Sequence, residues 1–189
     1  MRVISGLYRH RRFDVPRSFK ARPTTDFAKE NLFNVLRAYF DFEAGGVEAL
    51  DLFSGTGSIG LELCSRGCAR VVSVELDRQH HAFIRKVAES LHEERWKVLC
   101  GDAFRYIERA PSRFDLVFAD PPYALPRLGE LPQLVLSSPV LKEGGLFVLE
   151  HGKDYSFRGH AAFREERTYG SVHFSFFQKG EAPDLTEEG

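Results

Sequence analysis

The sequence predicts an α/β protein built on an open, mostly parallel sheet, and two observations support that prediction. From Val47 onward, short runs rich in β-branched and apolar residues alternate with stretches of helical periodicity. A glycine-rich loop, Gly55 to Gly60, follows the first of these runs and opens the first helical stretch. Such alternation is typical of β-α-β units with right-handed crossovers and helices on both faces of the sheet.

The first 44 residues precede this alternation, and we expect them to form a basic extension, residues 1–44. The segment VISGLYRHRRFDVP alternates loosely between apolar and polar residues around Gly6, which indicates a short β-hairpin. The segment RPTTDFAKENLFNVLRAYF follows, with a Thr-Thr-Asp capping signal and an apolar stripe at helical spacing. It predicts a helix over residues 25–40.

The main domain is expected to span residues 45–180 and to contain seven strands. Its last two strands, 161–169 and 172–179, flank a Gly-Ser turn and should pair antiparallel, which reverses one strand relative to the others. The acidic tail, residues 181–189, is short and contains proline, so we expect it to be disordered. The preceding elements are expected as strand 47–53, helix 58–66, strand 70–75, helix 77–92, strand 96–100, helix 104–108, strand 114–119, helix 128–137 and strand 145–150.

Composition and charge narrow the class of protein. The 189 residues include 43% hydrophobic and 28% charged side chains, which is ordinary for a folded soluble domain. No apolar run approaches the roughly 18 residues of a membrane span, and no secretory signal is evident, so we expect a cytoplasmic protein with no membrane partner. Cys64 and Cys68 lie one helical turn apart without a nearby His, which is poor zinc spacing and predicts no metal.

Positive charge is concentrated near the N-terminus. Residues 1–40 contain nine Lys or Arg and three acidic residues, whereas the whole chain has a net charge of −1. A basic arm on a mildly acidic body favours a polyanionic partner that is contacted through one end. A solvated charged face is the alternative.

The glycine-rich loop has the spacing of a nucleotide-binding loop. Gly55, Gly57 and Gly60 form G-x-G-x-x-G, and Glu75 follows 20 positions after Gly55, which matches a dinucleotide pattern. Asp51, four residues before Gly55, would repel a pyrophosphate but attract the ammonium and sulfonium of S-adenosylmethionine (SAM). Asp51 therefore favours SAM, with capping of the turn as its alternative role.

Two more carboxylates follow strand ends. Glu75 ends strand 70–75, where it can accept hydrogen bonds from both ribose hydroxyls of a nucleotide. Asp102 follows strand 96–100, where it can accept one from an adenine amino group. Because the carboxyl ends of parallel strands meet at one edge of an open sheet, these acids and Asp51 should line one ligand site.

The strand 114–119 runs into Asp120-Pro121-Pro122-Tyr123 (DPPY), where we expect the chemistry. The prolines fix the backbone and lack N–H donors, which leaves carbonyls able to accept hydrogen bonds. The Asp120 carboxylate and the Pro121 carbonyl could hold both N–H groups of an exocyclic amino group and turn its lone pair toward the SAM methyl. Tyr123 could stack on the base. The alternative is a Pro-Pro turn that merely ends a strand.

The segments LDLFSGTGSIGLELCSRG, VVSVELDR, GDAF and DPPY, in this order, resemble the Rossmann-like class I SAM-dependent methyltransferases that modify exocyclic amino groups. With RVISGLYRHRRFDVP and RPTTDFAKENLFNVL, the chain from Arg2 to about Lys179 is similar to the bacterial 16S rRNA guanine-N2 methyltransferases of the small ribosomal subunit, of the guanine 966 type. The resemblance implies methyl transfer from SAM, which becomes S-adenosylhomocysteine, to a guanine N2 amino group. DPPY alone is shared with adenine-N6 DNA methyltransferases.

The same resemblance implies a substrate and the roles of individual residues. We expect the substrate to be 16S rRNA within a small-subunit assembly particle that carries ribosomal proteins, because a small arm with few aromatic side chains gives limited sequence readout. The cofactor site falls on Asp51, Phe53, Gly55, Gly57, Glu75, Leu76, Asp102, Ala103 and Thr24, and catalysis falls on Asp120, Pro121, Pro122 and Tyr123. Phosphate contacts with RNA fall on Arg2, Arg9, Arg11, Arg12, Lys20 and Arg22.

Three rival interpretations stay open at this point. An adenine-N6 DNA methyltransferase would share DPPY, although the chain lacks a long target-recognition insert. A catalytically inactive RNA-binding assembly factor is disfavoured by the intact DPPY and the strand-end acids. An NAD-dependent oxidoreductase is disfavoured by Asp51. Glu150 and His151 end the last parallel strand near the ligand edge, and there we expect a loop-supporting role.

Overall fold

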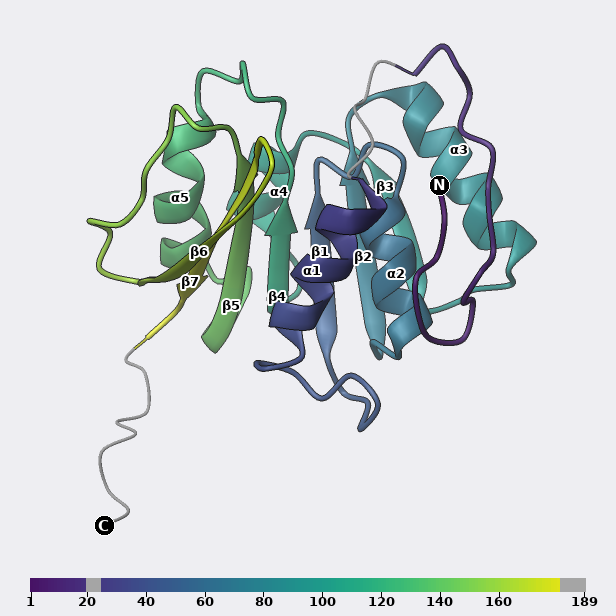
Figure 1. Cartoon of the computed structure of the whole chain (residues 1–189), viewed down its shortest axis with the longest axis horizontal. Coiled ribbons are helices and arrows are strands. Elements are labelled where there is room, and N and C mark those ends of the chain that lie inside the picture. Colours follow the sequence, from purple (N-terminus) through teal and green to yellow (C-terminus); the bar gives the residue numbers. More distant parts are fainter. Residues whose placement is uncertain (20–24, 181–189) are drawn as a thin grey trace.

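The computed structural model describes residues 1–19 and 25–180, which fold around a seven-stranded sheet in the order β3-β2-β1-β4-β5-β7-β6 (Figure 1). Strands β1 to β5 are parallel to one another, and β7 runs antiparallel to both β5 and β6. The mostly parallel sheet with one reversed strand is therefore confirmed. The strands are β1 Glu48–Leu52, β2 Arg70–Glu75, β3 Trp96–Cys100, β4 Phe114–Ala119, β5 Leu141–His151, β6 Phe163–Tyr169 and β7 Val172–Gln178.

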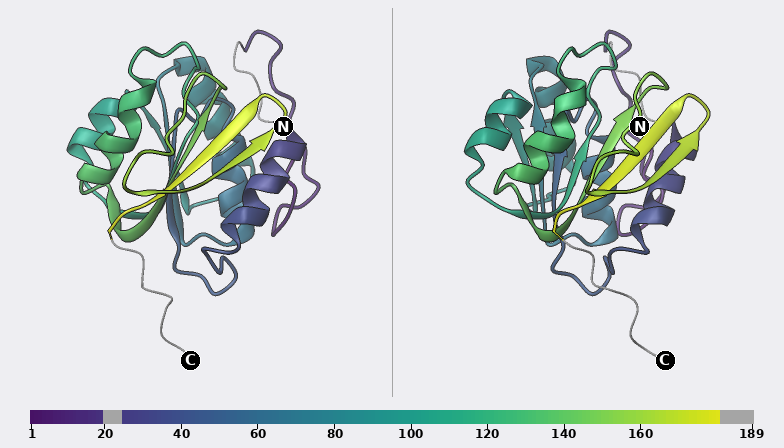
Figure 2. Two further views of the ribbon diagram at one scale, coloured as in Figure 1. Left: turned by 60° about the vertical axis from the view of Figure 1, so that its left-hand side comes forward. Right: turned by 90° about the vertical axis from the view of Figure 1, so that its left-hand side faces the viewer.

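Helices cover both faces of this sheet, as Figure 2 shows. Alternate strand residues point to opposite faces, so Ala49 of β1 belongs to one core and Leu50 to the other. The first core contains side chains from α1, α2 and α3, and the second contains side chains from α4, η1 and α5. The helices are α1 Asp26–Leu36, α2 Ser58–Arg66, α3 Arg78–Ser90, α4 Ala103–Arg109, the 3₁₀ turn η1 Leu128–Glu130 and α5 Leu131–Ser137.

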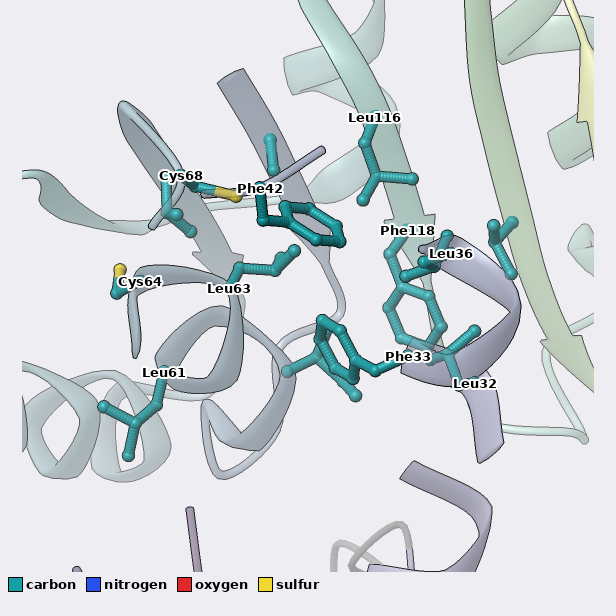
Figure 3. Close-up of a cluster of buried hydrophobic side chains, with 14 of the residues drawn as sticks. Leu32, Phe33, Leu36, Phe42, Leu61, Leu63, Cys64, Cys68, Leu116 and Phe118 are labelled. Carbon is teal, nitrogen blue, oxygen red and sulfur yellow. The ribbon is translucent and has the colours of Figure 1, made fainter. Parts of the chain in front are cut away.

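Helix α1 is part of the first core. Its Leu32, Phe33 and Leu36 side chains lie beside Phe118 of β4, as Figure 3 shows. Thr25 begins the helix by accepting a hydrogen bond from the Ala28 N–H at 3.1 Å. Helix α1, which belongs to the predicted extension, thus packs its apolar side chains in the same core as the sheet. The division of the chain at residue 44 stays a prediction.

The N-terminal segment doubles back on itself, as the predicted short β-hairpin requires. Backbone hydrogen bonds of 2.9–3.1 Å join residues 1–3 to residues 10–13 around an antiparallel bridge between Arg2 and Arg12. The backbone N–H groups of Ile4 and Ser5 donate to the Glu62 carboxylate on α2, at 2.8 and 3.0 Å. Because α2 takes these donors, the pairing stays short and the segment packs along this helix.

A buried lysine connects the N-terminal segment to α1 and α2. Lys29 of α1 is 1% exposed, and its Nζ donates to the Arg2 carbonyl and, at 3.0 Å, to Ser58 Oγ. Its nearest anion is Glu62, at 3.6 Å, which also pairs with Arg66. Burial lowers the pKa of Lys29, while Glu62 opposes that change.

Two element boundaries differ by four residues from those expected, and the others differ by at most two. Helix α1 ends at Leu36 and not at Phe40, because the N–H groups of Ala38 and Tyr39 bond to carbonyls only three residues back. Strand β5 begins at Leu141 and not at residue 145. The tail, residues 181–189, lies outside the described residues, so its expected disorder stays a prediction.

Candidate active site

A cavity of about 1120 Å³ lies at the carboxyl ends of the parallel strands. The chain leaves β1 for β2 on one side and returns to β4 on the other, so the cavity lies at the switch point of the sheet, where open α/β folds bind ligands. Among the predicted site residues, those on its wall are Asp51, Phe53, Gly55, Glu75, Leu76, Asp102, Ala103, Asp120, Pro121, Pro122 and Tyr123. Gly57 does not line the cavity, and Thr24 lies outside the described residues, next to cavity-lining Thr25.

Glu75 holds the glycine-rich loop against the end of β2. One of its carboxylate oxygens accepts the Gly55 N–H at 2.7 Å, and the other accepts the Asp77 N–H at 2.8 Å. Phe53, with φ of 57°, turns the backbone into this loop. Since each carboxylate oxygen can accept more than one hydrogen bond, this fixed Glu75 can also receive ribose hydroxyls.

Gly57 and Gly60 serve packing and do not contact the cavity. A Cβ on Gly57, whose φ is 76°, would lie 2.9 Å from Ile84 Cγ1. A Cβ on Gly60 would lie 2.5 Å from Ser73 Oγ and 3.1 Å from Asp51 Oδ2. These glycines therefore let α2 approach α3 and the sheet closely, as the later glycines of such loops do.

Replacement of Gly60 by Ala is expected to lower the free energy of unfolding by about 1–2 kcal/mol, because overpacking outweighs the roughly 1 kcal/mol that Ala gains in a helix. Gly159→Ala is the matched control, since no atom lies within 4 Å of its added Cβ. Urea denaturation measures both variants. Equal stability of Gly60→Ala and the unchanged protein would show that the close approach at Gly60 is not required.

Asp51 lies beneath the loop, 1% exposed, at the end of β1. Its Oδ2 accepts the Gly60 N–H at 3.2 Å and the Ser73 hydroxyl at 3.1 Å. Burial raises the pKa of Asp51 to about 7, although these hydrogen bonds act in the opposite direction. The Asp51 carboxyl thus supports the glycine-rich loop, which is the alternative role considered for it from the sequence. It also lines the cavity, where a cationic ligand would favour its ionised form.

Asp102 caps helix α4 at the cavity wall. Its Oδ1 accepts the Arg105 N–H at 2.9 Å. Ala103, which follows it, is buried in the second core, against which Phe53 packs. The three strand-end acids that the sequence singled out therefore lie on one cavity, each held by backbone N–H groups.

The DPPY segment is anchored at both ends. The Asp120 N–H donates to the Leu52 carbonyl at 3.3 Å, which joins the end of β4 to that of β1. The Leu125 N–H donates to the Pro122 carbonyl at 2.8 Å and closes the turn. The Tyr123 hydroxyl donates to Glu150 Oε1 at 3.0 Å, and its ring lies against Gly152, yet the residue stays 38% exposed. The ring is thus both fixed and accessible.

Glu150 belongs to this site, although the sequence indicated only support of a loop. It is 5% exposed, lines the cavity near the end of β5 and receives the Tyr123 hydroxyl. Burial raises the pKa of Glu150 to about 7, and burial together with the Glu150 carboxyl raises the pKa of Asp120 well above its usual range. The signal in the sequence that could have indicated this role was an acidic residue at the end of the last parallel strand, near the ligand edge. The neighbouring His151 is fully buried and bonds Ser175 Oγ at 2.8 Å.

The described RNA-contact candidates lie on the N-terminal segment, which contacts α1 and α2. Arg2 pairs with Asp26 in the first turn of α1, at 2.9 Å. The turn that leads to Arg9 contacts the last turn of α2, because the Tyr8 N–H donates to Ser65 Oγ at 2.9 Å. Residues 1–19 run beside α3 in Figure 1. RNA contact by Arg2, Arg9, Arg11 and Arg12 stays a prediction, and Lys20 and Arg22 lie outside the described residues.

Within residues 1–19 and 25–180, no group of three or more His, Cys, Asp or Glu side chains could hold a metal ion. Cys64 and Cys68 are buried free thiols, and burial raises the pKa of both. In this same part of the chain, none of the helices has the length and apolar character needed to cross a bilayer.

The sheet order, the reversed seventh strand and the cavity beside DPPY define a Rossmann-like methyltransferase. The solved structure of hypothetical protein TTHA0928 from Thermus thermophilus has a TM-score of 0.81 and 29% identity to this chain, over 94% of this chain and 98% of that one. The chain belongs to the family described as Conserved hypothetical protein 95, whose model matches residues 1–178.

Two curated relatives carry a more specific name. Ribosomal RNA small subunit methyltransferase D of Haemophilus influenzae is 31% identical over 184 residues, which cover 94% of this chain and 93% of that protein. The protein of the same name from Escherichia coli is 28% identical over 182 residues, with 95% and 90% covered. The family resemblance inferred from the sequence is confirmed.

Proposed function

We propose that this protein transfers the methyl group of SAM to the exocyclic N2 amino group of a guanine in 16S rRNA, the family position being guanine 966. The observation that carries the proposal is that the three strand-end acids and DPPY line one cavity. The relatives named as small-subunit rRNA methyltransferases support the substrate class. A small-subunit assembly particle with bound ribosomal proteins is the proposed partner, which places the reaction in the cytoplasm.

The chemistry of the cavity supports SAM as the cofactor. Asp51 would offset the cofactor's positive charge, Glu75 would accept the ribose hydroxyls, and Asp102 would accept the adenine amino group. Phe53, Leu76 and Ala103 supply apolar wall. The volume of about 1120 Å³ exceeds the common range for one small ligand, roughly 300–1,000 Å³, so a cofactor and an extruded base can share it.

The DPPY residues would orient the amino group. The Asp120 carboxylate and the Pro121 carbonyl would accept hydrogen bonds from its two N–H groups, and Tyr123 would stack on the base. When bound, SAM would supply an electrophilic methyl group for the new N–C bond, and its sulfur would leave with the electron pair of the S–C bond. Asp120 stabilises the positive charge that develops on nitrogen and then accepts its proton.

Methyl transfer from tritiated SAM to purified small-subunit particles and to naked 16S rRNA tests this proposal, with the product nucleoside identified by mass spectrometry. We expect one N2-methylguanine per particle and no product on DNA. Formation of N6-methyladenine in DNA would replace the proposal with the adenine enzyme. The absence of any SAM-dependent product would favour the assembly factor, and stabilisation of the protein by NAD but not by SAM in a thermal-shift assay would favour the oxidoreductase.

A further inference from the structure

Two carboxyl groups meet on the cavity wall beside the proposed methyl-transfer centre. Strands β4 and β5 pair in parallel, with Ala119 opposite Leu149, so Asp120 and Glu150 are the next residues in register. Their carboxyls are close enough to form a side-chain hydrogen bond with each other. The register of two adjacent strands therefore creates the pair.

Within the described chain, only one of the two carboxylate oxygens of Glu150 has a hydrogen-bond donor. Its Oε1 receives the Tyr123 hydroxyl at 3.0 Å, but its buried Oε2 has no hydrogen-bond donor within the described chain. Two ionised carboxylates have no hydrogen to donate to one another, so Oε2 gains a partner only when the pair carries a proton. A buried carboxylate oxygen without a donor is costly, which favours the protonated pair.

We infer that Asp120 and Glu150 share one proton, and that Glu150 is a positioning residue that receives this proton when an amino group binds to Asp120. The inference rests on the proposed function, because the amino group meets Asp120 only in that reaction. An Asp120 that kept the proton would be a weaker acceptor for the N–H, and it could neither offset the positive charge on N2 nor accept its proton. Glu150, as the protonated partner, then donates to Asp120 and holds it anionic toward the substrate.

The charges around the pair support a retained proton near neutral pH. Burial raises the pKa of Asp120 and of Glu150, the latter to about 7, and Asp51 on β1 raises that of Asp120 further. The Tyr123 hydroxyl, and to a smaller extent the hydrogen bond with Asp120, lower the pKa of Glu150. From β7 the register partner of Glu150 is Phe174, which carries no charge, and His151 points to the opposite face, toward Ser175.

The reaction balances with this pair. The sulfur–methyl bond breaks, the N2–methyl bond forms, and the proton released from N2 passes to Asp120. The pair then carries two protons, and one leaves to water when the product departs. No oxidant or further co-reactant is needed.

Titration of carbon-13-labelled carboxyl groups by NMR tests the pair without RNA. We expect Asp120 to titrate well above ordinary aspartates, and Glu150→Gln to lower its midpoint by about 1 pH unit or more, because an anion is replaced by an amide donor. Glu143→Gln, on the same strand but 78% exposed at its side chain, is the matched control and should leave the midpoint unchanged. An Asp120 midpoint that Glu150→Gln also leaves unchanged would overturn the inference.

Rescue by the conservative variant tests the positioning role. Glu150→Gln keeps an acceptor for Tyr123 and a donor for Asp120, so its methyl transfer should exceed that of Glu150→Ala by about tenfold or more, with SAM affinity unchanged. Equal losses in two variants that melt like the unchanged protein would overturn the role of Glu150. Inactivity of the unchanged protein on every RNA would overturn the proposed function instead, and the titration would still decide the pair.

Discussion

Replacement of Asp120 by Ala is expected to reduce methyl transfer by about two to four orders of magnitude. The variant loses the carboxylate that orients the amino group, stabilises the charge developing on nitrogen and accepts the proton. The affinity for SAM should stay within about threefold, because the proposed SAM contacts are made by other residues. Single-turnover transfer to small-subunit particles measures the first quantity, and calorimetry measures the second.

Asp154→Ala is the control for this prediction. Asp154 is exposed in the loop after β5 and does not line the cavity, so its removal should leave the transfer rate unchanged. Turnover retained by Asp120→Ala would contradict the role assigned to DPPY. A parallel loss of SAM binding would instead mean that Asp120 is required to build the cofactor site.

Replacement of Asp51 by Asn is expected to weaken SAM binding by about ten- to a hundredfold. The Asn side-chain oxygen can still accept the Gly60 N–H and the Ser73 hydroxyl, so the loop should keep its shape while the negative charge is lost. Calorimetry on a variant that melts like the unchanged protein measures this loss. An unchanged affinity would leave Asp51 with only its loop-supporting role.

The same carboxyl predicts how SAM binding depends on pH. The pKa of Asp51 is raised from its ordinary 3.8 to about 7, and a cationic ligand favours the ionised form. SAM should therefore bind more tightly as pH rises toward 7, with a proton released on binding below that value, and Asp51→Asn should abolish both effects. Without ligand the sign is opposite for folding: Asp51 lowers the stability as pH rises from about 4 to 7, because the unfolded chain releases this proton first. Calorimetry in buffers of different ionisation enthalpy counts the protons.

Much of the fold could be predicted from local patterns. Buried runs such as RVVSVE have no polar face, and a glycine at each turn fixes where the adjoining helix begins or ends, so β2 and α2 have the expected bounds. The start of β5 was missed because Lys142 to Gly144 look like a loop in sequence. The Gly144 N–H bonds to the Lys179 carbonyl at 2.8 Å, a contact 35 residues away that no local pattern contains.

The candidate site likewise contains residues that local patterns could place and residues that they could not. Asp51, Glu75 and Asp102 could be placed together because parallel strands bring their carboxyl ends to one edge. The pairing of Glu150 with Asp120 depends on the register between β4 and β5, and the burial of Lys29 depends on how the N-terminal segment packs on α2. Sequence spacing determines neither of these, since both are long-range packing results.

The central claim is that this protein places a methyl group on N2 of one guanine in small-subunit rRNA. Nucleoside mass spectrometry and primer extension on that rRNA, from cells with and without the protein, test it most directly. The account predicts that one N2-methylguanine disappears without the protein and returns with the unchanged chain but not with Asp120→Ala. An unaltered complement of N2-methylguanine in the cells that lack the protein would contradict it.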